Sequence, residues 1–296
     1  MRSDGEATSI RDLSIVSFVN TFSVMVVLGS VSTAYFFVQY FHAVVPLSLY
    51  WIIGSGVWII YTSDHLLDGL RLKDDAIFLR HAIHYQYRQI LIPTVCAIAL
   101  FDVYVVIQFF PWWMLENGLI LLGMVAIYFV LFWRWKTGLA GTVKEVFIAV
   151  MVAVGMIVYP GLCGQLSWDL TDLTIIALFA VINYANLLIF TYFDHEGDQT
   201  NQLLSGSGII GPDRIRGRIY SMLTLAFTLL TLYAFFGKAD LKISATISVL
   251  VMLNVLLLTL QFEERFRDQE WFRFWGDFIY VVPTPIWLFM NEVSLF

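Results

Sequence analysis

Long apolar runs alternate with shorter polar segments along the whole chain. A helix needs about 20 mostly apolar residues to cross the hydrocarbon core of a bilayer, and several runs meet or approach this length. The runs cover residues 13–40, 43–63, 89–110, 117–134, 145–166, 171–193, 217–236, 242–262 and 275–292. This pattern predicts an all-α, polytopic membrane protein with nine transmembrane helices, folded as a single membrane domain over residues 1–296.

The composition agrees with a membrane environment. The chain has 296 residues, of which 59% are hydrophobic and 14% are charged. Soluble domains carry about 25% charged residues, because water must cover their surface. Lipid is therefore the expected solvent for most of the exterior. The basic residues are too dispersed along the chain for a nucleic-acid partner.

The basic residues also indicate how the predicted spans are oriented. Cytoplasmic segments of membrane proteins are enriched in Lys and Arg. With a cytoplasmic N-terminus, every Lys and Arg except Lys238 and Lys242 falls in an inner segment or an adjoining helix end. The inner segments are then 1–12, 64–88, 134–144, 194–216 and 263–274. We therefore expect an integral protein of an inner or plasma membrane, with its C-terminus outside, a cytoplasmic tail at 1–12 and long cytoplasmic loops at 64–88 and 194–216.

Two pairs of aspartates stand at the predicted inner ends of the second and sixth spans. Asp64 and Asp68 form one pair, and Asp194 and Asp198 form the other. Residues four apart leave the same face of a helix, where like charges repel each other. A positive partner is therefore expected, and Mg²⁺ suits carboxylate oxygens while keeping waters that substrate phosphates can replace. A single pair would indicate a solvated helix end, but two pairs on one side favour a metal site.

The positions of the two pairs also suggest an internal duplication. Each pair ends the second helix of a four-helix block, so we expect two four-helix blocks with a ninth helix appended. Sites at the interface of structural repeats are common in membrane folds. His65 and His195 each follow the first aspartate of a pair, and hydrogen-bonding or solvated roles are favoured for both over metal ligation.

The two motifs resemble those of the UbiA superfamily of intramembrane prenyltransferases. That family has nine helices, a cytoplasmic N-terminus and aspartate-rich motifs at the inner ends of helices two and six. Asp64 and Asp68 match the last two aspartates of its first motif, Asn-Asp-x-x-Asp-x-x-x-Asp. Asp194 and Asp198 match the Asp-x-x-x-Asp that ends the second motif.

The resemblance implies Mg²⁺-dependent transfer of a prenyl group from an isoprenoid diphosphate to a hydrophobic acceptor within the membrane. The four aspartates would hold Mg²⁺ and carry the catalysis. The family's Tyr-x-x-x-Lys element helps to hold diphosphate, and its lysine matches Lys136, with Phe132 at the tyrosine position. Further candidates for substrate binding are Lys144, Arg71, Asn183 and Asn186.

The first motif departs from the family pattern, because Ile60 and Tyr61 replace its opening Asn-Asp. Two alternatives to prenyl transfer therefore stay open. One is a UbiA-type terpene cyclase acting on a prenyl diphosphate, and the other is a catalytically silent subunit that binds lipid or pigment in a membrane complex. A transporter is disfavoured, because the aspartates lie near the inner helix ends and a conduction path needs polar residues at the midplane.

Overall fold

The computed structural model describes the chain at residues 10, 13–134, 138–200, 211–236 and 239–293. Within these ranges the chain is almost entirely helical and forms no strand. The first half contains α1 (Ile15–Thr21), α2 (Val24–Tyr40), α3 (Ser48–Leu72), η2 (Lys73–Asp75), α4 (Leu79–Gln86), α5 (Arg88–Phe109) and α6 (Trp112–Arg134). The predicted all-α class is confirmed for the described part of the chain.

The second half begins with a continuous helical stretch that contains a π-helical segment. This stretch consists of α7 (Gly138–Ala153), the π-helical segment (Val154–Val158) and α8 (Tyr159–Leu162). The remaining elements are α9 (Leu170–Thr200), α11 (Pro212–Phe236), α12 (Ala239–Gln261), α13 (Glu263–Arg267), η4 (Asp268–Glu270), α14 (Trp271–Phe278) and α15 (Pro283–Val293). Each apolar run of the sequence therefore coincides with one helix or with two or three consecutive ones.

Five described helical stretches are long and apolar enough to cross a membrane. They are Arg88–Phe109, Val143–Leu162, Leu170–Gly197, Pro212–Phe236 and Ile243–Gln261. α1 and α2 pass the same test together as a pair bent by 67°, which gives up to six spans. These helices indicate a membrane-embedded protein. The number nine stays a prediction, because the described apolar part of α6 is shorter and α15 has 11 residues.

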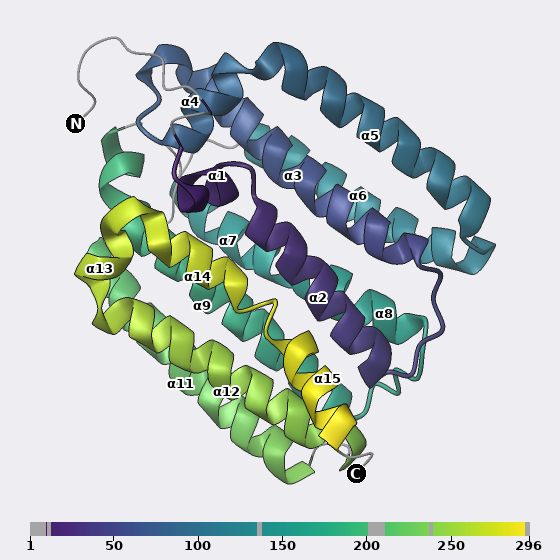
Figure 1. Cartoon of the computed structure of the whole chain (residues 1–296). Coiled ribbons are helices and arrows are strands. Elements are labelled where there is room, and N and C mark those ends of the chain that lie inside the picture. The colour runs from purple at the N-terminus through teal and green to yellow at the C-terminus, as the bar shows by residue number, and fades with distance from the viewer. Residues whose placement is uncertain (1–9, 11–12, 135–137, 201–210, 237–238, 294–296) are drawn as a thin grey trace.

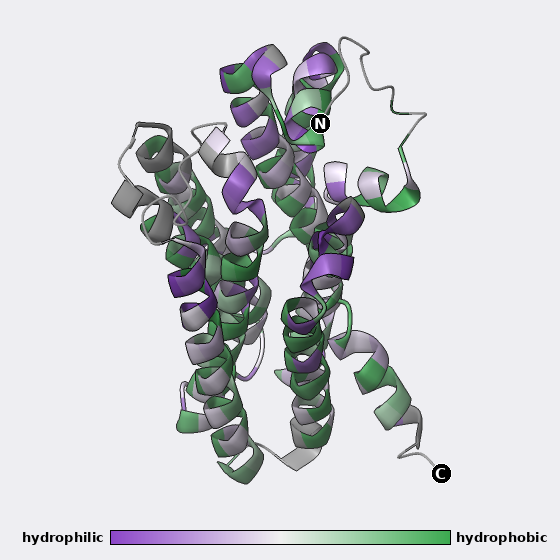
Figure 2. Cartoon of the chain, turned by 90° about the vertical axis from the view of Figure 1, so that its left-hand side faces the viewer, coloured by the Kyte–Doolittle hydropathy of each residue, from purple (hydrophilic) through white to green (hydrophobic). Residues whose placement is uncertain are grey.

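The polar segments after the second and sixth spans are more helical than the loops predicted there. α3 continues to Leu72, and α4 follows within the segment 64–88. α9 continues to Thr200 and so enters the segment 194–216. An apolar run shows only which part of a helix can lie in lipid. The helix can continue past the end of that run, because its backbone hydrogen bonds do not depend on apolar side chains. Hydrophilic residues gather toward the end of the bundle that holds α4, as Figure 2 shows.

The helices form two groups in Figure 1: α3, α5 and α6 lie on one side and α9, α11 and α12 on the other, with α2 and α14 between them. α9 is central to the second group and packs against α7, α11, α12 and α14. The main core lies here, where side chains of α2, α9, α11 and α12 meet. α5 is peripheral and only 11% buried over its apolar window, which is expected of a helix that faces lipid. The contacts of α14 and α15 with both α2 and α12 join the two groups.

The last predicted span is broken between α14 and α15. Side chains of α2 satisfy the carbonyls that the break leaves free: Thr33 Oγ1 donates to Tyr280 O at 2.7 Å, and Ser32 Oγ donates to Val281 O at 2.8 Å. Gly29 permits this approach, because a Cβ atom there would overlap Tyr280. A broken helix is tolerated at membrane depth only where protein groups satisfy its backbone. The break brings Tyr280 and Asp277 to the interior of the bundle.

Candidate functional site

The first acidic pair lies on the C-terminal part of α3 and meets partners from two other helices. The Asp64 carboxylate accepts a hydrogen bond from the Tyr128 hydroxyl of α6, with 3.3 Å between Oδ1 and the hydroxyl oxygen. Lys144 Nζ of α7 lies 3.5 Å from the same Oδ1. Asp64 keeps 32% of its side chain exposed. The lysine predicted to bind diphosphate is therefore held at the first aspartate pair.

Asp68 is the carboxyl group of this pair that is harder to ionise. Burial and the neighbouring Asp64 carboxylate raise the pKa of Asp68 to about 6, although Lys144, Arg80 and Arg71 act in the opposite direction. Like charges at this spacing disfavour joint ionisation. Ionisation of both carboxyl groups is therefore unfavourable without a further positive charge, and a metal ion at this pair stays a prediction.

Asp194, from the second pair, is compensated within the protein. Its Oδ2 atom accepts from Arg80 Nη2 of α4 at 3.2 Å and from Arg273 Nη2 of α14. Only 9% of the Asp194 side chain is exposed. A buried carboxylate needs such partners, because removing one charge from water without its counter-charge is costly.

Arg80 joins the two acidic motifs. It pairs with Asp194 through Nη2, and its Nη1 atom lies 3.5 Å from Glu270 Oε1 of η4. Its charge also opposes the rise in the pKa of Asp68. Arg273 Nε lies 3.6 Å from Glu270 Oε2, which closes the network. Charged groups of α3, α4, α7, α9 and α14 therefore lie at one end of the bundle, as the shared position of the two motifs predicted.

The other predicted site residues fall in different places. Arg71 is exposed on α3. Asn183 and Asn186 are buried on α9, closer to the middle of the bundle. The Asp198 side chain and Lys136 lie outside the described residues, so their predicted roles stay predictions.

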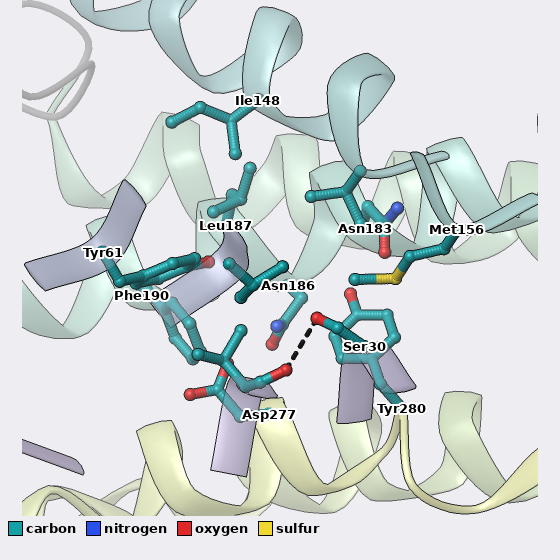
Figure 3. A pocket seen from close by; sticks show the side chains of 13 residues that line it. Ser30, Tyr61, Ile148, Met156, Asn183, Asn186, Leu187, Phe190, Asp277 and Tyr280 are labelled. Carbon is teal, nitrogen blue, oxygen red and sulfur yellow. Dashed lines mark hydrogen bonds between the residues drawn. The ribbon is translucent and has the colours of Figure 1, made fainter. Parts of the chain in front are cut away.

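A small cavity lies beside the charged network, between α2, α3, α7, α9 and α14 (Figure 3). Its volume is about 40 Å³, enough for a few ordered waters or one small functional group. Its walls are mostly apolar, and the π-helical segment contributes Met156. Such segments within α-helices occur frequently at functional sites. The polar side chains that line it are Ser30, Tyr61, Asn183, Asn186, Asp277 and Tyr280.

Three histidines form a buried cluster next to the network. The ring of His65 on α3 lies 5.4 Å from that of His81 and 5.2 Å from that of His84, both on α4. His84 Nδ1 lies 2.7 Å from the Arg80 carbonyl oxygen. Burial lowers the pKa of each of the three, so neutral rings are expected. The solvated role considered for His65 is wrong, because its side chain is buried and its ring packs beside His81 and His84.

The sequence did not identify Arg80, Arg273, Tyr128 or Asp277 as site residues. The two arginines counted only as evidence for orientation, because inner basic residues are common in membrane proteins. Asp277 falls within an apolar run, and an ionisable residue in such a run is a signal of function. It could have been singled out on that ground alone.

The described side chains fit the predicted magnesium site only in part. Asp194 does not fit, because two guanidinium groups cover its Oδ2 atom. No group of three or more His, Cys, Asp or Glu side chains placed to share an ion occurs in the described ranges. Asp64 and Asp68 fit better, since two carboxylates one turn apart face a single lysine and suit a hard divalent cation.

Comparison with protein-family models, with curated proteins and with solved structures finds no match to this chain. The resemblance to the UbiA superfamily therefore stays a prediction from motifs and topology. The geometry of the site is the remaining basis on which to argue function.

Proposed function

We propose that the chain binds an isoprenoid diphosphate at the charged end of its helix bundle and transfers the prenyl group to a hydrophobic acceptor. The observation that carries this proposal is the position of Arg80, which pairs with Asp194 and also acts on Asp68. Helices from both halves of the chain thereby place cations and carboxylates together. The cavity between the same helices adds an apolar chamber.

The cations suit the leaving group of such a reaction. Diphosphate leaves an allylic carbon readily only when its developing charge is neutralised, and fixed cations serve this purpose well. Each guanidinium has five N–H donors, so Arg80 and Arg273 can contact Asp194 and still offer donors to phosphate oxygens. Arg273 Nε is buried and lies 3.6 Å from Glu270 Oε2, and it makes no hydrogen bond among the described residues. Lys144 adds a third positive charge from α7.

A Mg²⁺ ion held by Asp64 and Asp68 would supply further charge neutralisation as the C–O bond breaks. The chain's own contribution is then to orient the diphosphate through Arg80, Arg273 and Lys144. The apolar walls of the cavity would keep water from the allylic cation, which water would otherwise capture. In this scheme the first motif, Asp64 and Asp68, binds the metal, and Asp194 of the second motif positions the two arginines that contact the diphosphate.

A lipid-binding subunit without activity is the second candidate. Its support is the compensation of Asp194 by two arginines, which leaves the second motif without the metal-binding role that the resemblance implies for it. A cyclase would share the diphosphate site and need no acceptor. A transferase yields diphosphate and a prenylated acceptor, a cyclase yields diphosphate and a hydrocarbon, and a silent subunit leaves the prenyl diphosphate intact.

The test is incubation of purified protein with farnesyl or geranylgeranyl diphosphate, with and without Mg²⁺ and with and without a membrane lipid extract as the source of acceptor, while diphosphate release is followed. We expect Mg²⁺-dependent release, and its loss in Asp64→Ala and Asp68→Ala. Asp75→Ala is the control, because Asp75 is an exposed acid after the same helix. Hydrocarbon formed without an acceptor would favour a cyclase. No release with either chain length would contradict the enzymatic proposal and favour the silent subunit.

A further inference from the structure

Glu270 of η4 is the more exposed of the two carboxylates that contact Arg80 and Arg273. Its side chain is 34% exposed, whereas that of Asp194 is 9% exposed. Its contacts are also longer, with 3.5 Å from Oε1 to Arg80 Nη1 and 3.6 Å from Oε2 to Arg273 Nε. Solvent-exposed ion pairs contribute little to stability, whereas breaking a buried pair is costly. Glu270 is therefore the counter-ion that can leave the arginines more easily.

The two arginines carry no surplus of positive charge while both carboxylates contact them. Arg80 and Arg273 contribute two positive charges. Asp194 and Glu270 contribute two negative charges. An anion that approaches the guanidinium groups would lie beside the Glu270 carboxylate, and placing like charges together is unfavourable. A diphosphate therefore binds the arginines favourably only if Glu270 moves away from them.

The backbone of Glu270 adopts a conformation that is unusual for its residue type. Its φ of 57° and ψ of 37° lie in the left-handed region. A residue with a Cβ atom keeps this conformation only where surrounding contacts hold it. The contacts of the carboxylate with two arginines supply part of this restraint. The rest comes from α1, where Asn20 Nδ2 donates a hydrogen bond to Glu270 O at 3.0 Å.

α1 contacts each of the elements that carry the two arginines and Glu270. It packs against α4, η4 and α14, and Figure 1 shows it between α4 and α14. A bend of 67° separates α1 from α2, and Ser23 at this bend has a left-handed φ of 55°. α1 is thus held by the bend at one end and by its contact with Glu270. A change in the backbone of Glu270 would remove the acceptor of Asn20 and loosen α1.

We propose that Glu270 occupies the anion site of the ligand-free protein, and that an incoming diphosphate group displaces its carboxylate from Arg80 and Arg273 and thereby loosens α1. Glu270 is then an internal competitor of the ligand, and α1 is the segment that responds to binding. This inference rests on the proposed function for the choice of diphosphate as the anion. It concerns binding alone, so it can be tested without turnover.

The first test is the affinity for inorganic diphosphate in lipid nanodiscs, measured without Mg²⁺ so that a metal ion at the first motif does not contribute. We expect Glu270→Gln to bind diphosphate about tenfold more tightly than the unaltered protein, because the amide removes the competing charge. Glu264→Gln is the matched control and should leave the affinity unchanged, because Glu264 is exposed on α13 outside the network. Equal or lower affinity of Glu270→Gln, or no binding by either protein, overturns the proposal.

The second test follows α1 in the unaltered protein and needs no variant. Amide hydrogen exchange of residues 15–23 would be measured with and without saturating inorganic diphosphate. We expect faster exchange in the presence of diphosphate, whereas a ligand that binds beside a fixed α1 would slow exchange or leave it unchanged. Glu270→Gln should show faster exchange than the unaltered protein already without the ligand. Slower or unchanged exchange of α1 on diphosphate binding overturns the link between Glu270 and α1.

Failure of this proposal can be distinguished from failure of the proposed function. If Glu270→Gln binds inorganic diphosphate more tightly, but neither protein releases diphosphate from farnesyl diphosphate with Mg²⁺, the enzymatic function fails and the role of Glu270 stands. If release occurs and the two proteins bind inorganic diphosphate equally, the enzymatic function stands and the role of Glu270 fails. Equal thermal midpoints of Glu270→Gln and Glu264→Gln would confirm that the two variants are comparably folded.

Discussion

Arg80 of α4 and Asp194 of α9 form an ion pair with 3.2 Å between Nη2 and Oδ2, and the two side chains are only 7% and 9% exposed. Arg273 of α14 contacts the same carboxylate oxygen. The pair therefore ties together three helices that are far apart in the sequence. A buried ion pair of this kind favours one arrangement of the helices, because any arrangement that separates the pair leaves a buried charge without its counter-charge.

Removal of the Asp194 carboxylate should destabilise the protein strongly. Asp194→Ala leaves two buried guanidinium groups without their shared partner, a change that costs about 3–5 kcal/mol in buried ion pairs. The measurement is the free energy of unfolding in mixed micelles. Glu196→Ala is the control on the same helix, because Glu196 is exposed. Equal effects of the two substitutions would show that the network does not hold the helices together.

The buried histidines predict a loss of stability in mild acid. Burial lowers the pKa of His84 to about 4 and also lowers that of His81. An unfolded histidine titrates near about 6.5, so below this pH the unfolded state binds more protons and is favoured. For His84, which is fully buried, the loss is roughly 2 kcal/mol at pH 5.

The corresponding measurement is the thermal midpoint of the purified protein between pH 7 and pH 5. We expect the midpoint to fall with pH and to fall less in His84→Asn, which keeps a donor for the Arg80 carbonyl. His42→Asn is the matched control, because His42 is exposed and asparagine tolerates its positive φ of 49°. A midpoint that is independent of pH would argue against neutral buried rings.

The predicted orientation can be tested with single cysteines. Arg71 and Glu116 are both exposed, and the positive-inside pattern puts them on opposite sides of the membrane. In a background without Cys96 and Cys163, a membrane-impermeant maleimide should label Glu116→Cys in intact cells. Arg71→Cys should react only after permeabilisation. The reverse pattern, or equal labelling, would refute the orientation.

The helical architecture could be predicted because lipid imposes a simple rule. Apolar runs of sufficient length must be helical in a membrane, and the described runs are helical. The acidic pair on α3 could be predicted as well, because its spacing fixes one helix face. The bend between α1 and α2 could not, because nothing in the local sequence requires the left-handed backbone of Ser23.

The partners of Asp194 could not be predicted either. Arg80 lies 114 residues away and Arg273 lies 79 residues away, so only tertiary packing brings them to this carboxylate. From the four-residue spacing of Asp194 and Asp198 alone, we predicted a metal ion between two like charges. The fold supplies guanidinium groups instead, and this difference moves the metal proposal to Asp64 and Asp68.

The binding of an isoprenoid diphosphate tests the central claim most directly. Labelled geranylgeranyl diphosphate would be titrated against the protein in lipid nanodiscs, with geranylgeraniol, which lacks the diphosphate, as competitor. We predict saturable binding that geranylgeraniol displaces poorly, and that weakens about tenfold, or about 1.4 kcal/mol, in Lys144→Gln. Arg214→Gln is the control, because Arg214 is an exposed cation outside the network and should leave the affinity unchanged. The absence of saturable binding, or equal competition by geranylgeraniol, would contradict the claim that this end of the bundle is a diphosphate site.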